Sequence, residues 1–151
     1  MITGKKFLLI DDSSTAISLI RSMLNSAGIS NDNIDSTTDS LKAIRLLASH
    51  SYDIVISDYN MRHHIDGGLI FDEVKQRKLL PSDGVFICVT GDNTEQVVSH
   101  FIELEPDDYL IKPFCGAVFV ERIEKVLERK SALFPLLMAV DNKEFQTAIG
   151  L

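Results

Sequence analysis

The chain of 151 residues is long enough for one domain with its own core, and 45% of its residues are hydrophobic. Its 15 basic and 22 acidic residues give a net charge of −7, which opposes a nucleic-acid backbone and favours a partner protein or a cation. No apolar run approaches the roughly 20 residues of a membrane span, and no signal segment opens the sequence. We therefore expect a cytoplasmic protein without direct nucleic-acid or membrane contact, in which Cys88 and Cys115 are ordinary thiols.

Five short apolar runs predict β-strands. Because these runs are apolar on both faces, they favour a parallel sheet that helices cover on each side. The runs are Phe7 to Ile10, a weaker one near Ile34, Ile54 to Ile56, Val85 to Val89, and Tyr109 to Ile111.

Helical spacing of apolar residues follows each run. The first helix is predicted to begin after an N-cap at Ser13 and to stop at Gly28. The alternation gives five βα units and predicts a doubly wound α/β fold with right-handed crossovers. The positions that define the helices are Ile17, Ile20, Leu24 and Ala27; Leu41, Ile44 and Leu47; Ile70, Phe71 and Val74; Val97, Val98, Phe101 and Ile102; and Phe119, Ile123, Val126 and Leu127.

Polar side chains follow four of the predicted strands. Asp11 and Asp12 come after the first run, Asp58 after the third, Thr90 after the fourth and Lys112 after the fifth. In a doubly wound fold the site lies outside the carboxyl ends of the strands. We therefore expect these five side chains to meet at one edge of the sheet.

Three carboxylates at one edge repel one another, and a hard divalent cation with oxygen ligands relieves that repulsion. Mg²⁺ fits because it needs one or two carboxylates and keeps room for a phosphoryl oxygen. Thr90 and Lys112 would complete a pocket for an anionic tetrahedral group. Asp58 is the best-placed nucleophile, alone at the exit of the central strand.

Each residue also has a simpler interpretation when it is taken alone. Asp11 or Asp12 could cap the helix that follows. Thr90 could cap the next turn, and Lys112 could be a solvated charge. The shared position of all these residues at strand exits favours the site.

Four motifs carry a family resemblance. In order, FLLIDDSS, VISDYNM, FICVTGD and DDYLIKPF closely resemble the receiver domain of two-component response regulators, of the chemotaxis type, over about residues 5–130. The resemblance implies a five-stranded parallel sheet in the flavodoxin-like order 2-1-3-4-5 with helices on both faces. It also implies a phosphorylation-dependent signalling domain, not an enzyme, that assists only its own phosphorylation and dephosphorylation.

The resemblance assigns a role to each acid of the site. Asp58 would be the phosphoacceptor, and it would take the phosphoryl group from a histidine kinase or a phosphotransfer protein. Asp11, Asp12 and Asp58, with the backbone carbonyl of Asn60, would hold Mg²⁺.

It also implies a switch. Thr90 would bond the phosphoryl oxygen and move inward, and Tyr109 would follow into the vacated space. This movement would remodel the face formed by the fourth helix, the fifth strand and the fifth helix, and so control a partner or an output. Lys112 would pair with the phosphate, and its bond to Pro113 is expected to be cis.

The loop after the acceptor departs from the family pattern. In DYNMRHHIDGG, Arg62 replaces the usual proline and one residue is added before Asp66 and Gly67. The loop is therefore longer and less constrained. His63 and His64 lack a nearby third ligand and make a poor zinc site, so we interpret them as ordinary loop residues.

Two other functions are compatible with parts of the pattern. A pseudo-receiver would be an interaction module without phosphorylation, but it would not need all five polar residues. An aspartyl-phosphate hydrolase of the haloacid dehalogenase type would carry D-x-D after its first strand, whereas this chain has D-D. The receiver is the preferred interpretation.

The last residues extend beyond a receiver, so we divide the chain into a receiver domain at 1–130 and a helical extension at 131–151. Apolar spacing resumes at Leu133, Leu137 and Val140, with Pro135 in a first turn. A later F-x-x-A-I stretch faintly resembles the start of a tetratricopeptide repeat. The extension could open a helical-repeat output region, form a homodimer, or simply lengthen the fifth helix over its own domain.

Overall fold

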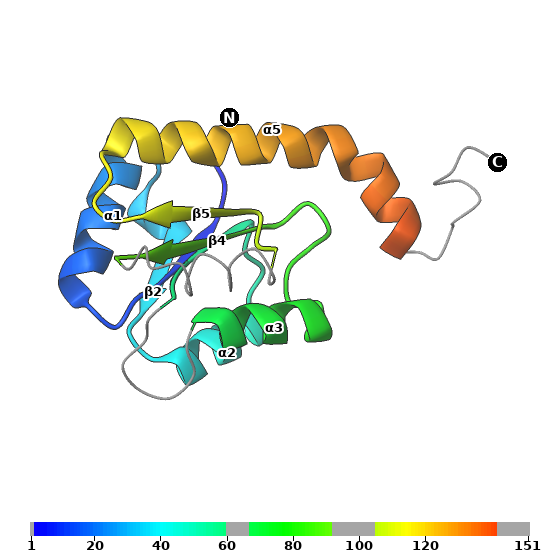
Figure 1. Ribbon diagram of the computed structural model, residues 1–151, viewed down its shortest axis with the longest axis horizontal. Coiled ribbons are helices and arrows are strands. Elements are labelled where there is room, and N and C mark those ends of the chain that lie inside the picture. Colours follow the sequence, from blue (N-terminus) through cyan, green and yellow to red (C-terminus); the bar gives the residue numbers. More distant parts are fainter. Residues whose placement is uncertain (1, 60–66, 92–104, 142–151) are drawn as a thin grey trace.

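The computed structural model describes residues 2–59, 67–91 and 105–141 (Figure 1). Its centre is a sheet of five parallel strands in the order β2-β1-β3-β4-β5. The predicted flavodoxin-like sheet is therefore confirmed. The strands are β1 (Phe7–Ile10), β2 (Ile34–Thr37), β3 (Ile54–Asp58), β4 (Val85–Thr90) and β5 (Asp108–Ile111).

Helices cover both faces of the sheet. Helices α1 and α5 pack together over one face and α2 and α3 over the other (Figure 1). The predicted helix around Val97 to Ile102 lies outside the described residues. The described helices are α1 (Ser14–Ser26), α2 (Ser40–Ser49), α3 (Gly67–Arg77) and α5 (Gly116–Asp141), with a short 3-10 turn η1 (Asn31–Asn33).

Two hydrophobic cores result from the alternation of side chains along the buried strands. Phe7 and Leu9 of β1 belong to the core beneath α1 and α5, whereas Leu8 and Ile10 belong to the core beneath α2 and α3. Successive side chains of a strand point to opposite faces, so a strand covered on both sides must be apolar throughout. This is why β1, β3 and β4 read as unbroken apolar runs.

Helix α1 begins and ends where the sequence predicts. Ser13 is the N-cap, and its hydroxyl accepts a hydrogen bond from the amide of Ala16 at 3.2 Å. The helix ends at Ser26, and Gly28 follows with a φ of +96°. A left-handed residue after a helix favours glycine, because other side chains are strained there.

Helix α2 faces the core with smaller residues than its apolar spacing suggests. Ser40, Ala43 and Leu47 are buried, whereas Leu41 is 42% exposed. The buried face is therefore rotated from the stripe of Leu41, Ile44 and Leu47.

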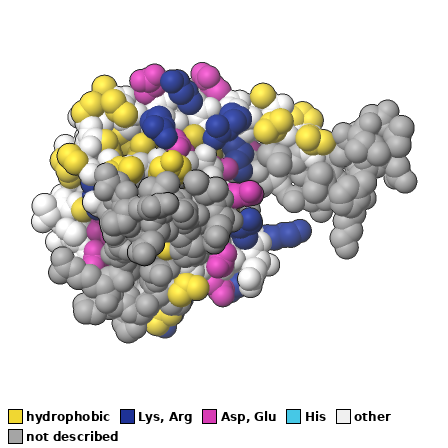
Figure 2. Space-filling model, viewed as in Figure 1, with side chains coloured by type: hydrophobic (Ala, Val, Ile, Leu, Met, Phe, Trp, Pro, Cys, Tyr) yellow, Lys and Arg dark blue, Asp and Glu magenta, His cyan; other side chains and the backbone are white. Residues whose placement is uncertain are grey.

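Helix α5 continues past residue 130 without a break and ends at Asp141. The expectation of Pro135 in a first turn is wrong, because this residue lies in the helix interior, where it removes one backbone hydrogen bond. Leu133 and Leu136 are about half exposed, and Figure 2 shows apolar side chains along this part of the helix. The division at residue 130 stays a prediction, and residues 142–151 lie outside the described part.

None of the helices in the described ranges combines the length and hydropathy that crossing a bilayer requires.

Candidate functional site

An acidic site lies at the carboxyl edge of the sheet. The register places Ile10 of β1 beside Ser57 of β3, so Asp11, the residue after β1, and Asp58, the last residue of β3, lie at the same level. Asp12 comes next in the turn toward α1. One carboxylate oxygen from each of the three acids lies within 4.8 Å of the others. The structure therefore brings together the three acids that the sequence places at strand exits.

The site acids differ in their exposure to solvent. Asp11 is 3% exposed and Asp58 is 7% exposed, whereas Asp12 is half-buried. Burial makes a charged carboxylate costly unless an opposite charge or a cation compensates for it. The two deepest acids therefore need a cation close to them.

Lys112 supplies part of that compensation. Its Nζ donates a hydrogen bond to Asp11 Oδ2 at 2.9 Å and lies 3.9 Å from Asp58 Oδ1. Its backbone amide donates to the carbonyl of Thr90 at 2.7 Å, which continues the pairing of β4 with β5. The bond between Lys112 and Pro113 is cis, as the resemblance implies.

The turn into α1 uses one of the acids as well. Asp11 Oδ1 accepts a hydrogen bond from the amide of Ser13 at 2.9 Å. The cap of the helix is nevertheless Ser13, so neither Asp11 nor Asp12 takes the N-cap role considered as an alternative. Asp11 thus has one oxygen toward the turn and the other toward Lys112.

Thr90 and Tyr109 lie on neighbouring strands. Thr90 is fully buried at the end of β4, and it pairs in register with Ile111. Tyr109 pairs with Cys88, two residues before Thr90, and packs partly buried against the core beneath α2 and α3. Because Cys88 and Thr90 point to the same face of their strand, the threonine and the tyrosine share one face of the sheet.

Next to Tyr109 is an ion pair that the sequence interpretation missed. Arg122 on α5 donates from Nε and Nη2 to the two carboxylate oxygens of Asp108, at 2.8 and 2.6 Å, and also bonds the carbonyl of Tyr109 at 3.4 Å. The bond to Asp108 raises the pKa of this guanidinium. Arg122 therefore ties α5 to two consecutive residues of β5, Asp108 and Tyr109. The only sequence signal was an acid and an arginine 14 residues apart.

The donor set at the acidic site fits a hard divalent cation. Three carboxylates and one ammonium leave two negative charges among these described groups, and oxygen ligands suit Mg²⁺ or a similar ion. Asn60, whose carbonyl was expected as a further ligand, lies outside the described residues. So do Arg62, His63 and His64 of the altered loop.

With this geometry in place, comparison with known proteins defines the class. The family model for the response regulator receiver domain matches residues 7–124. The chain therefore belongs to the response regulator receiver domain family.

Relatives and solved structures agree with this assignment. The chemotaxis protein CheY-3 of Vibrio cholerae is 26% identical over 124 residues, which cover 82% of this chain and 92% of that protein. The probable transcriptional regulator ycf27 of Cyanidium caldarium is 26% identical over 135 residues, which cover 89% of this chain and 51% of that protein.

Two solved structures show the same fold. The CheY-like receiver domain of Methanospirillum hungatei has a TM-score of 0.72 at 16% identity, and the match covers 85% of this chain and 97% of that one. Chemotaxis protein CheY4 of Vibrio cholerae has a TM-score of 0.70 at 20% identity, with 81% and 98% covered.

Proposed function

We propose that this chain is a phosphoacceptor in which Asp58 takes a phosphoryl group from a histidine kinase or a phosphotransfer protein. One observation carries the proposal, namely the crowding of three acids within 4.8 Å beside a lysine that contacts two of them. Structural ion pairs balance their charges, whereas the described groups of this site carry an excess of negative charge that a cation and a phosphoryl group would use. Family membership supports the same interpretation.

The reaction is a direct transfer between side chains. A carboxylate oxygen of Asp58 forms a bond to phosphorus as the bond from phosphorus to the donor histidine nitrogen breaks, and that nitrogen keeps the electron pair. The ammonium of Lys112, 3.9 Å from Asp58, neutralises charge on the phosphoryl oxygens. The hydroxyl of Thr90 bonds one of these oxygens.

Asp11, Asp12 and Asp58 would hold Mg²⁺, with Asn60 as the further ligand that we propose. The ion would supply positive charge that offsets the repulsion between the carboxylates and the phosphoryl group. Asp12 is half-buried and more exposed to solvent than Asp11.

The switch that we propose runs from Thr90 to Tyr109. Both residues share one face of the sheet, and Tyr109 borders a shallow hollow formed with Ile111, Val118 and Arg122. Inward movement of the tyrosine would change this surface of β5 and α5. The surface already exposes Ile111 at 39% and Val118 at 43%, so a partner could bind there by apolar contact.

We also propose a cytoplasmic location for the protein. We expect protein partners and no direct nucleic-acid contact, because the net charge of −7 opposes a phosphate backbone. It acts on itself and turns over no substrate of its own. We assign residues 1–130 to the receiver and 131–151 to an extension that forms a homodimer or leads into an output region, since Leu133 and Leu136 are exposed there.

The test is phosphorylation by a small phosphodonor in the presence of Mg²⁺. Wild type should gain the mass of one phosphoryl group, and Asp58→Asn should gain none, because the amide cannot form the acyl phosphate. The matched control is Asp32→Asn, an exposed acid of η1 at the other edge of the sheet, which should be phosphorylated like wild type.

Each other outcome identifies a different function. No mass gain on wild type would indicate a pseudo-receiver. Multiple turnover of phosphomonoesters would indicate a hydrolase. Equal labelling of Asp58→Asn and wild type would place the acceptor elsewhere and contradict the proposal.

A further inference from the structure

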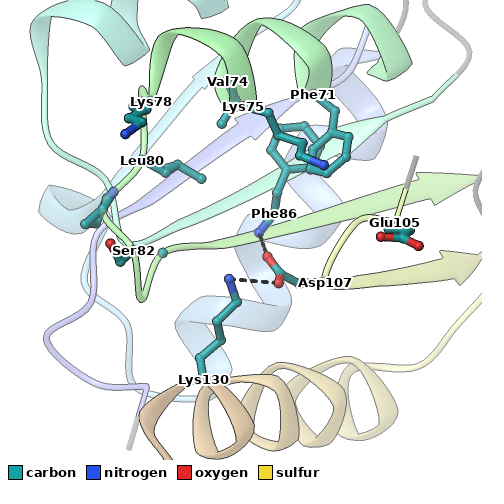
Figure 3. A pocket seen from close by; sticks show the side chains of 12 residues that line it. Phe71, Val74, Lys75, Lys78, Leu80, Ser82, Phe86, Glu105, Asp107 and Lys130 are labelled. Atoms are coloured by element: carbon teal, nitrogen blue, oxygen red, sulfur yellow. Dashed lines mark hydrogen bonds and ion pairs between the residues drawn. The ribbon is translucent and has the colours of Figure 1, made fainter. Parts of the chain in front are cut away.

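A second hollow lies at the amino edge of the sheet, away from the acidic site (Figure 3). It measures about 350 Å³ and is bordered by α3, the start of β4, the segment before β5, and α5. This volume falls within the range of small-molecule sites. Its lining consists of Phe71, Val74, Lys75, Lys78, Leu80, Pro81, Ser82, Gly84, Phe86, Glu105, Asp107 and Lys130.

The hollow combines an apolar wall with a rim of lysines. Phe71, Val74 and Leu80 form the wall, while Lys75 and Lys78 come from the α3 side and Lys130 from α5 opposite them (Figure 3). An apolar body could pack on this wall while an anionic group meets the ammonium groups.

The two acids of the lining do not neutralise all three lysines. Asp107 accepts hydrogen bonds from the amide of Phe86 at 2.8 Å and from Lys130 at 3.0 Å, so each of its carboxylate oxygens has a partner (Figure 3). Lys75 lies over the ring of Phe71, and Lys78 forms an ion pair with none of the described acids. Three lysines face two acids here, in a chain of net charge −7. Figure 2 shows basic and acidic side chains close together in the region between α5 and α3.

Two residues of the lining have a left-handed backbone. Lys78 has a φ of +51° and Glu105 a φ of +56°, and these are the residues other than glycine with positive φ among those described. At Lys78 this conformation ends α3, because the amide of Leu79 bonds the carbonyl of Val74 at 3.0 Å, as in a helix C-cap. The end of α3 therefore places Lys78 at the hollow, where Glu105 is also part of the lining.

We propose that this hollow binds a small organic anion, namely an apolar ring or chain that carries one carboxylate or phosphate. The apolar body would lie against Val74 and Leu80. The anionic group would bind between Lys75 and Lys78 on one side and Lys130 on the other, whose ammonium has three N–H donors and so can bond Asp107 and the anion together. The site shares no residue with the acidic edge, so its occupancy does not require phosphorylation of Asp58.

Calorimetric titration with naphthoate tests the proposal, with naphthalenemethanol as the neutral probe of the same shape. Wild type should bind naphthoate saturably and the neutral probe at least about tenfold more weakly. K75Q/K78Q should bind naphthoate about tenfold or more weakly, because each lost charge-assisted contact is a sizeable part of a small ligand's affinity. Asp58→Asn should bind like wild type, which separates this proposal from the phosphoacceptor.

The matched control is K42Q, which removes an exposed lysine of α2 outside the hollow. It should bind naphthoate like wild type. Absence of naphthoate binding, equal binding of the neutral probe, or equal weakening by K42Q and K75Q/K78Q would overturn the proposal. Thermal unfolding of each variant verifies that the fold is kept.

Discussion

Two sites at opposite edges of one sheet carry opposite excess charge among their described residues. At the carboxyl edge three acids outnumber Lys112, whereas the lining of the hollow at the amino edge has three lysines and two acids. The acids lie at or just after strand ends, so the sheet itself sets their positions. The lysines are on or next to helices α3 and α5, so helix packing sets theirs. The strand ends thus define one site and the flanking helices the other.

Cys88 lies on β4, which runs between these two edges, and acids at both edges contribute to the pKa of its thiol. Burial raises the pKa of its thiol from 9.0 to about 12, with further contributions from Asp107 at the amino edge and Asp58 at the carboxyl edge. The unfolded chain therefore loses this proton first. The stability from Cys88 is fully present below pH 9 and is lost as the pH rises from 9 toward 12.

The largest expected effect is on stability in alkali. Because one pKa unit corresponds to about 1.4 kcal/mol, the thiol should cost wild type about 3 kcal/mol of unfolding free energy between pH 9 and about pH 12. Cys88→Ala should be less stable at neutral pH, through lost packing, but should lack this part of the alkaline slope. Urea unfolding at a series of pH values measures both.

The control for that experiment is Cys115→Ala, since this second thiol is exposed. It should keep the wild-type slope. Tyr52, whose pKa is raised by burial and then by its bond to Asp35, ionises in all three proteins and cancels in the comparison. Parallel slopes for wild type and Cys88→Ala would show that the fold does not raise the pKa of this thiol.

These two edges also show what the sequence could predict. Asp11, Asp58 and Lys112 were predictable as a cluster because parallel strands end at one edge, so the order of apolar runs already places them together. The hollow at the other edge was not predictable. Its Lys130 and Lys75 are brought together by the way α5 and α3 flank the sheet, and no local pattern encodes that approach.

Addition of Mg²⁺ should give the second-largest change in the free energy of unfolding, and this change should depend on the carboxyl edge alone. At a concentration one hundred times its Kd, the ion should stabilise wild type by about 2.7 kcal/mol, since it binds only the folded state. Asp12→Asn should lose most of this gain, whereas Lys130→Gln should keep it. Thermal unfolding with and without Mg²⁺ measures the difference. If Mg²⁺ stabilised Asp12→Asn as much as wild type, the acid cluster would not be the metal site.

At the amino edge, Asp107→Ala should produce a smaller effect of about 2 kcal/mol. The truncation leaves the buried amide of Phe86 without its side-chain acceptor, and an unsatisfied buried donor costs about 1–3 kcal/mol. Asp107→Asn should cost less, because the amide oxygen can still accept. Denaturant unfolding tests the order, and equal losses for the two variants would assign the cost to the charge pair with Lys130.

The burial pattern of α2 and the position of Pro135 show a second limit of sequence reasoning. Apolar spacing predicts a helix but allows a rotation of its buried face, so Leu41 is exposed where Ala43 packs. Proline is tolerated in the first turn of a helix or, at a cost, in the interior of a helix. Which of the two positions Pro135 takes depends on whether the helix before it ends near residue 130. The residues there carry no stop signal such as glycine, and α5 continues through them.

The continuous helix α5 has a mechanical consequence. Asp107 holds it at its midpoint, through Lys130 and through the bond from Arg129 to the Asp107 carbonyl. From Lys130 to Asp141 the helix path is about 16 Å at about 1.5 Å per residue, so a tilt of about 10° at that anchor displaces the far end by about 3 Å. A small shift at the sheet thus becomes a larger displacement at the end of α5. Within this part of the helix, the turn around Pro135 bends most easily, because the proline has no amide hydrogen to donate.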